Sequence, residues 1–167
     1  MMQLGQKLRW HKYMTPELKK CADNLVIQAV TLKNLLVQLH DEVDAEQFSD
    51  EFLENTQELR FLRQIRQTEK EEDGIWLYRL NTVVAIRCVS EDDAQKESDD
   101  GEIEPLLEIK AEFVAQYESA CALTEDEINQ FGQKHVYYHV WPYWREVLQS
   151  SCARLGISPI VIPPLRV

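Results

Sequence analysis

Two histidines, His135 and His139, stand four residues apart, a spacing that places both side chains on one face of a helix, as two metal ligands would require. A helical zinc-protease motif carries a glutamate between its histidines, but the residues between these two are a valine and two tyrosines. No third ligand has a recognisable place in the sequence. The spacing therefore indicates ordinary helix-surface histidines rather than a metal site.

Ser150, Ser151 and Cys152 are the candidate nucleophiles, and they stand near the end of a predicted helix rather than on a strand-to-helix elbow. The five glycines are scattered singly, so that no glycine-rich loop is formed to hold a phosphate. These observations indicate that the protein is not an enzyme, and they give no reason to expect a cofactor.

A dense cluster of aromatic residues remains. Five of them crowd the eight residues 137–144: Tyr137, Tyr138, Trp141, Tyr143 and Trp144. One helical face cannot bury so many rings, and aromatic side chains dominate contact energies where they are desolvated. The cluster has two interpretations: packing on the apolar side of a sheet, beside Trp76 and Tyr78, or contact with a partner or another subunit.

A net charge of −11 on 167 residues would repel a phosphate backbone, which argues against nucleic-acid binding. The length suits one domain, and no apolar run approaches the roughly 20 residues that a membrane-spanning helix needs. The four cysteines stand far apart with no C-x-x-C pair, and the N-terminus lacks the apolar stretch of a secretory signal. We therefore expect a cytoplasmic protein with reduced thiols and no membrane insertion.

The charge is unevenly distributed along the chain. Residues 1–22 carry five basic residues against one acidic residue, a net of +4, so the remainder carries −15. We interpret residues 1–22 as a basic N-terminal arm and residues 23–167 as a single domain. The arm could fold back on the acidic body, cover a neighbouring subunit, or stay loose.

Three segments have the composition of strands. Residues 25–39 are rich in apolar and β-branched residues, residues 75–89 are apolar at nearly every even position, and residues 106–117 alternate cleanly between apolar and charged residues. Residues 90–104 hold eight acidic residues and one lysine, which predicts a solvated hairpin loop.

Residues 41–72 are ambiguous between helix and strand. Their Glu, Gln, Arg and Leu content suits a helix, yet Leu59, Phe61 and Ile65 would also share one face of a strand. Periodicity does not decide between the two.

The last third of the sequence is helical. A capping box, T-E-D-E from Thr124, predicts a short helix that ends near Gly132. Residues 135–155 carry a helical apolar stripe, Gly156 suits its C-terminal end, and Pro142 either begins or kinks this helix. Strands followed by helices predict an α+β fold, an antiparallel meander with its helices on one face.

The sequence resembles the SecB chaperone family in several places. The run VWPYWREVLQSSCARLGISPIVIPP, residues 140–164, resembles the family signature, and W-P-Y-W-R-E is its most specific part. Residues 28–39 and 58–63 resemble the first strand and the start of the second, and the strand at 106–117 occupies its expected place. The resemblance implies a four-stranded antiparallel sheet with helices on one face, a strand at residues 58–68, and a homotetramer built as a dimer of dimers.

The resemblance also implies a function. SecB proteins are holdases that bind non-native polypeptides without ATP, in apolar grooves between the sheet and a helix. By position, Leu59, Phe61 and Ile65 would contribute to a client-binding groove here, and from the aromatic cluster we add Trp141, Tyr143 and Trp144.

Two departures from the family bear on its partners. The acidic residues that dock the export translocase motor correspond here to Asn34 and Gln38, and Glu108 is the candidate that keeps an acidic docking position. The C-terminal helix of the family also has no counterpart after Pro164. Protein export and the chaperoning of an antitoxin therefore stay open as rivals, and the alternative from another class is an oligomeric interaction protein without client binding.

Overall fold

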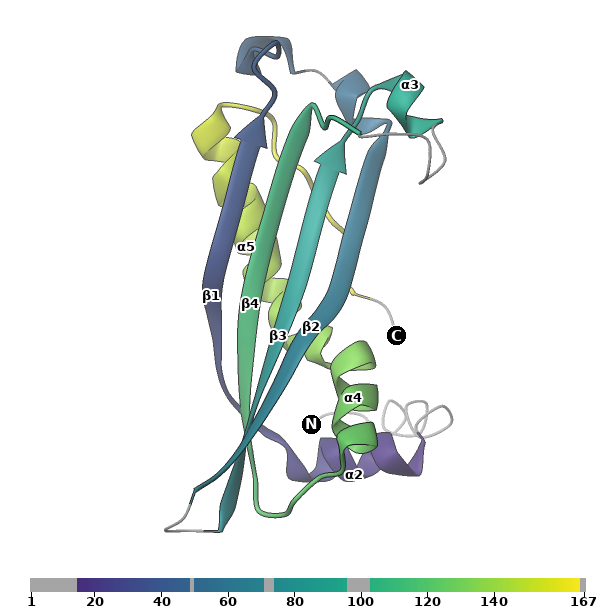
Figure 1. Ribbon diagram of the computed structural model, residues 1–167. Coiled ribbons are helices and arrows are strands. Elements are labelled where there is room, and N and C mark those ends of the chain that lie inside the picture. Colours follow the sequence, from purple (N-terminus) through teal and green to yellow (C-terminus); the bar gives the residue numbers. More distant parts are fainter. Residues whose placement is uncertain (1–14, 49, 71–73, 96–102, 166–167) are drawn as a thin grey trace, which may run out of the picture.

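The computed structural model describes residues 15–48, 50–70, 74–95 and 103–165, and Figure 1 shows their arrangement. In chain order the elements are α2 (Pro16–Asn24), β1 (Val26–Leu39), η1 (Ala45–Gln47), η2 (Asp50–Leu53), β2 (Thr56–Lys70), β3 (Ile75–Cys88), α3 (Glu91–Ala94), β4 (Leu107–Ser119), α4 (Glu125–Lys134) and α5 (Val136–Leu155). The fold is α+β: a four-stranded antiparallel sheet with helices packed on one face, as the family resemblance implied. The simple meander predicted from the order of elements is wrong, because β2, β3 and β4 pair in sequence order but β1 pairs with β4 rather than with β2.

The strands follow the order β1-β4-β3-β2, so β1 and β2 are the two edges of the sheet. Helix α5 packs along β4 and β1, α4 packs against β2, and α2 packs against α4. In Figure 1, α5 runs behind the strands, and α4 and α2 lie beside the lower, twisted end of the sheet. We call this covered side the helix face and the opposite side the open face.

Alternation along the strands separates the two faces. In β4 the odd-numbered residues from Leu107 to Tyr117 are all buried in the core of the helix face. The charged residues between them, such as Glu108 and Lys110, belong to the open face. Most residues of β3 are buried on both sides of the sheet, and its even positions Tyr78 and Ile86 pair with Tyr117 and Ile109 of the helix face.

Both outer strands are irregular where they pass the middle of the sheet. The register of β1 against β4 shifts between Leu32 and Asn34, and that of β2 against β3 shifts between Leu62 and Gln64. The residues at these two bulges are Lys33 and Arg63. A bulge re-aims the side chain that it carries, and both basic groups turn toward the centre of the open face.

The predicted helix signals are confirmed. Thr124 and Glu127 form both halves of a capping box at the start of α4, and Gly156 ends α5 in the left-handed conformation, with φ of 74°. Helix α4 continues two residues past Gly132, to Lys134. Gly132 lets the helix approach the sheet, because a Cβ there would lie 2.7 Å from Leu62 Cδ2. Pro142 neither begins nor ends α5, which runs from Val136 to Leu155.

The ambiguous stretch is resolved in the described residues. Two short 3-10 helices, η1 and η2, precede β2, and the strand at residues 58–68 is confirmed inside it. The predicted acidic loop, residues 90–104, instead begins with the short helix α3, whose N-cap is Ser90; residues 96–102 lie outside the described part of the chain.

Of the predicted basic arm, residues 1–14 lie outside the described part of the chain. Helix α2 straddles the predicted boundary at residue 22 and buries Leu18 and Cys21 in the core. Lys20 Nζ contacts Glu127 of α4 at 2.8 Å, so a basic side chain of this segment does meet the acidic body.

Within the described residues, no helix combines the length and the apolar character needed to cross a membrane.

Candidate functional site: a groove between the sheet and helix α5

A groove of about 580 Å³ lies on the helix face, between α5 and strands β2 and β3. We call it the helix-side groove. β3 contributes Val84 and Ile86, α5 contributes Trp141 and Trp144, β2 contributes residues 58–60, and the C-terminal tail contributes residues 162–165. Its lining is therefore mainly apolar and aromatic, with Glu58 and Arg60 as charged groups beside it.

The tail that follows α5 forms part of the groove. Residues 157–165 carry no helix or strand, yet Ile157, Ile160 and Ile162 are buried in the core. Trp141 Nε1 donates a hydrogen bond of 2.8 Å to the carbonyl oxygen of Pro163. This bond satisfies the indole N–H at the border of the groove and fixes the extended tail against α5.

Shallower hollows continue the groove along the β2 edge of the sheet. One lies between Arg60 and Tyr137, and the next lies between Leu62 and Asn129 of α4. Arg60 borders both the main groove and the first hollow, and its guanidinium lies 5.6 Å from the centre of the Tyr137 ring, a cation–π contact. The edge of the sheet thus presents a series of hollows in which apolar side chains alternate with polar and charged ones.

The structure divides the aromatic cluster. Tyr137, Trp141 and Trp144 are buried, and both tryptophans also line the helix-side groove. Tyr143 is 49% exposed and does not line this groove. Core packing and groove lining are therefore combined in the same two indole rings.

The predicted residues of β2 do not share one face. Ile65 pairs with Leu80, packs against the core and lines the hollow beside α4. Leu59 and Phe61 pair with Ala85 and Val83, whose register places them on the open face. The bulge between Leu62 and Gln64 causes this difference, because an extra residue reverses the alternation. Leu59 still borders the groove from the edge strand.

The two histidines spaced for metal binding have other surroundings. Tyr117 Oη and His139 Nδ1 are 2.9 Å apart, and burial lowers the pKa of His139. Burial likewise lowers the pKa of His135, helped by the nearby charge of Lys134. Among the described residues, no group of three His, Cys, Asp or Glu side chains gathers as metal ligands would.

The cysteines are free thiols in this structure. Cys21, Cys88 and Cys152 are buried, and burial raises the pKa of each thiol, that of Cys21 to about 11. A thiol of such high pKa is a poor nucleophile at neutral pH, so these residues serve packing.

The open face contains an ionic cluster that the sequence did not indicate. Glu112, near the middle of β4, is only 5% exposed. Its carboxylate accepts hydrogen bonds from Lys33 of β1 at 3.0 Å, Asn81 of β3 at 3.0 Å and Arg63 of β2 at 2.8 Å. Burial alone would raise the pKa of Glu112, but the bonds from Lys33 and Asn81 and the charge of Arg63 outweigh it and lower the pKa. One carboxylate thus joins side chains from all four strands.

Glu108, the predicted motor-docking residue, also lies on the open face. Its neighbours in register are Gln38 of β1 and Arg87 of β3. A single carboxylate beside an arginine does not make this part of the face acidic.

The architecture was compared with known proteins. A solved structure of the SecB-like chaperone Rv1957 of Mycobacterium tuberculosis, in complex with a ChAD peptide from the HigA1 antitoxin, superimposes with a TM-score of 0.62. The match covers 90% of this chain and 94% of that chain. The fold is SecB-like. Sequence identity over the match is 14%, and the likeness therefore establishes the fold alone.

No protein-family model matches the sequence, and no curated protein matches it at a significant level. The SecB-like fold agrees with the resemblance found in residues 140–164, and the residues of that segment form α5 and the tail beside the helix-side groove. The protein similar in structure is a chaperone.

Proposed function

We propose that this protein is an ATP-independent holdase that binds non-native polypeptides, and that the helix-side groove is its client-binding site. The observation that carries this proposal is a groove lined by two tryptophans and by apolar residues of β3 and the tail, on a SecB-like fold. Unfolded chains expose apolar side chains, and each such side chain buried in the groove contributes about 25 cal/mol per Å².

The edge of the sheet supports the same proposal. β2 is an edge strand, so the backbone groups on its outer side have no partner strand in the described chain. An extended client segment could pair with this edge while its side chains enter the hollows beside it. Backbone pairing is independent of sequence, as a chaperone with many clients requires.

We also propose that the chain forms a homotetramer, a dimer of dimers. The other edge strand, β1, displays three large apolar residues that are 41–60% exposed: Val26, Leu32 and Leu36. Register places Leu32 on the helix face and Val26 and Leu36 on the open face. Pairing of two β1 edges would set these side chains beside their counterparts in the second copy and would leave both helix-side grooves accessible. Several weak sites on one particle raise the affinity for a long unfolded chain through effective concentration.

Two client classes remain, and the structure favours one. The SecB-like protein of similar structure was solved with an antitoxin peptide, which supports an antitoxin as client here. Docking of the export motor would use acidic residues on the sheet, and Glu108 is flanked by Arg87 while Asn34 and Gln38 are uncharged. We therefore propose an antitoxin ahead of exported proteins.

The test is suppression of aggregation of a chemically unfolded substrate, without nucleotide. Wild-type protein is expected to protect the substrate. Leu165→Glu places a charge in the groove and should weaken each site at least about tenfold, because burying a leucine is worth roughly 1.5–3 kcal/mol. Leu59→Glu, at the border of the groove, should have a smaller effect.

Val161→Glu is the matched control, since this residue of the same tail is 73% exposed and does not line the groove. It should leave protection unchanged. A wild-type oligomer that gives no protection would support the alternative, an interaction protein without client binding. Equal protection by wild type and Leu165→Glu would indicate that clients bind outside the groove.

A further inference from the structure

The open face of the sheet is positively charged, although the protein as a whole is acidic. Strand register and ion pairs place seven basic residues on it: Lys33 of β1, Arg63, Arg66 and Lys70 of β2, Arg79 and Arg87 of β3, and Lys110 of β4. Three acidic residues, Glu108, Glu112 and Glu118, lie among them. Seven positive against three negative charges give this face +4, whereas the chain carries −11.

Part of this positive charge has no counter-charge. Lys33 and Arg63 contact Glu112, and Lys70 contacts Glu118. Arg66, Arg79 and Lys110 form no ion pair with any described residue. Arg66 and Arg79 are moreover direct neighbours in register, and like charges directly opposite each other on a sheet are destabilising. An anion placed over this pair would relieve the repulsion.

The same face exposes large apolar side chains beside the basic ones. In register, Lys110 stands between Leu36 of β1 and Ala85 of β3, and Ala85 is followed by Leu59 of β2. Leu36 is 41% exposed, Leu59 is 52% exposed and Phe61, two residues further along β2, is 40% exposed. Lys110 thus has a leucine beside it on the β1 side and, beyond Ala85, a second leucine on the β2 side.

We propose that the open face is a docking surface for an acidic polypeptide segment of a partner protein, one that carries apolar residues between its carboxylates. Carboxylates contact Lys110 and the pair of Arg66 and Arg79, and apolar side chains cover Leu59 and Phe61. Lys110 and Gln116, the β4 neighbour of Arg79, are six residues apart, so an extended segment of about 20 Å connects both sites.

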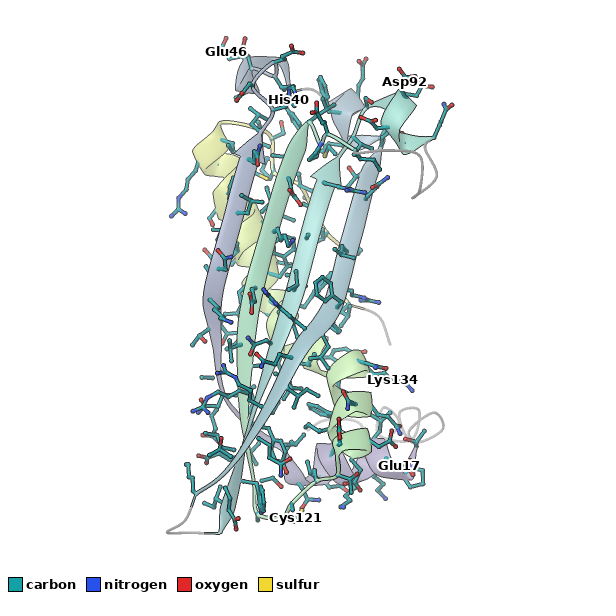
Figure 2. All side chains as sticks on the ribbon, viewed as in Figure 1. Glu17, His40, Glu46, Asp92, Cys121 and Lys134 are labelled. Atoms are coloured by element: carbon teal, nitrogen blue, oxygen red, sulfur yellow. The ribbon has the colours of Figure 1, made fainter. Side chains whose placement is uncertain are left out.

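Nucleic acid fits this surface less well. Neutralising a phosphate backbone needs a broad positive field, but the remainder of this chain, outside the open face, carries −15. Figure 2 shows Glu46 and Asp92 at one end of the sheet, where carboxylates would repel a phosphate chain that extends beyond the face. A short acidic peptide stays within the positive area.

The proposal concerns the opposite side of the sheet from the helix-side groove. Leu59 of the edge strand borders both surfaces, so the charge variants are placed at Arg66 and Lys110, which do not line the groove. The probe is a fluorescently labelled synthetic peptide of alternating glutamate and leucine, and its binding to the full chain is followed by anisotropy at low and moderate salt. A lysine–leucine peptide and a single-stranded oligouridine are measured in parallel. We expect binding of the acidic peptide alone, weakened by salt.

The variant R66E/K110E reverses two exposed charges that have no partner among the described residues, and it should weaken binding at least tenfold. K19E/R154E makes the same change in net charge at exposed positions of α2 and α5 and should change the affinity less than about twofold. The variant R66Q/K110Q should give an intermediate loss and checks that the effect does not come from misfolding.

Four outcomes would overturn the proposal: no binding of the acidic peptide, equal weakening by the open-face and control variants, tighter binding of oligouridine than of the peptide, or a change in particle mass for R66E/K110E. The last result would assign the face to contact between copies of this chain. Protection of unfolded substrates by R66E/K110E should equal that of wild type, so a failure here is distinguishable from a failure of the chaperone proposal.

Discussion

The two faces of the sheet are built from the same four strands but are stabilised by different interactions. On the helix face, burial of apolar side chains against α4 and α5 forms the core and leaves a groove with aromatic walls. On the open face, Glu112 is buried without a covering helix, because Lys33, Arg63 and Asn81 converge on it. Under the two proposals, the helix face would bind apolar clients of many sequences, whereas the open face would bind a partner of defined charge.

The largest expected effect on stability concerns Trp144, whose ring is buried in the core and also lines the helix-side groove. Trp144→Ala should lower the free energy of unfolding by about 3–5 kcal/mol, because a fully buried indole leaves a cavity. Tyr143→Ala, at the adjacent and 49% exposed position, should lower it by less than about 1 kcal/mol. Urea denaturation measures both. Similar losses for the two variants would contradict the division of the aromatic cluster.

The next largest effect on stability is expected on the open face, at Glu112. Glu112→Gln should lower the free energy of unfolding by about 2 kcal/mol, since it leaves Lys33 and Arg63 without their counter-charge; the half-exposed ends of these side chains keep the loss below that of a fully buried pair.

Glu118→Gln is the matched control, because it removes the same charge from the more exposed pair with Lys70 and should change stability by less than about 1 kcal/mol. If the two glutamines have equal effects in urea denaturation, Glu112 does not hold the four strands together.

The smallest expected effect is a pH dependence of stability that arises from two histidines on the helix face. Because burial lowers the pKa of His135 and His139 in the folded protein, the unfolded chain takes up their protons first as the pH falls. The two neutral histidines therefore make their full contribution to the free energy of unfolding above the pKa of an unfolded histidine, about 6.5. That contribution is lost as the pH falls from there through their lower pKa in the folded protein. Thermal unfolding between about pH 7 and pH 5 should show a falling midpoint, with a shallower slope for His139→Gln. If the slope of the midpoint against pH is unchanged in His139→Gln, His139 does not contribute to the pH dependence of stability.

Local sequence patterns were sufficient for most of the fold. The alternation in residues 106–117 and the capping box at Thr124 gave β4 and the start of α4, since each depends on neighbouring residues only. β2 could not be derived in this way, because its Glu, Gln and Arg residues suit a helix and its place is decided by pairing with β3. Only the family resemblance predicted a strand there.

The groove and the ionic cluster could be predicted from the sequence less well than the fold. The bulge at Arg63 reverses the alternation of β2, which separates Ile65 from Leu59 and Phe61; no local signal marks this bulge. Glu112 has the spacing of a solvent-facing residue in β4, and its burial arises from contacts to residues 31, 49 and 79 positions away. The tail could be predicted to be extended from its prolines, but not that Pro163 accepts the Trp141 hydrogen bond.

The central claim is that unfolded chains bind in the helix-side groove and not on the open face. A photo-crosslinking amino acid in place of Arg60, which is exposed at the groove, is compared with one in place of Lys110, exposed on the open face. With a labelled unfolded substrate and no nucleotide, the account predicts strong crosslinks from position 60 and background levels from position 110. Crosslinks from position 110 alone, or from neither position, would contradict it.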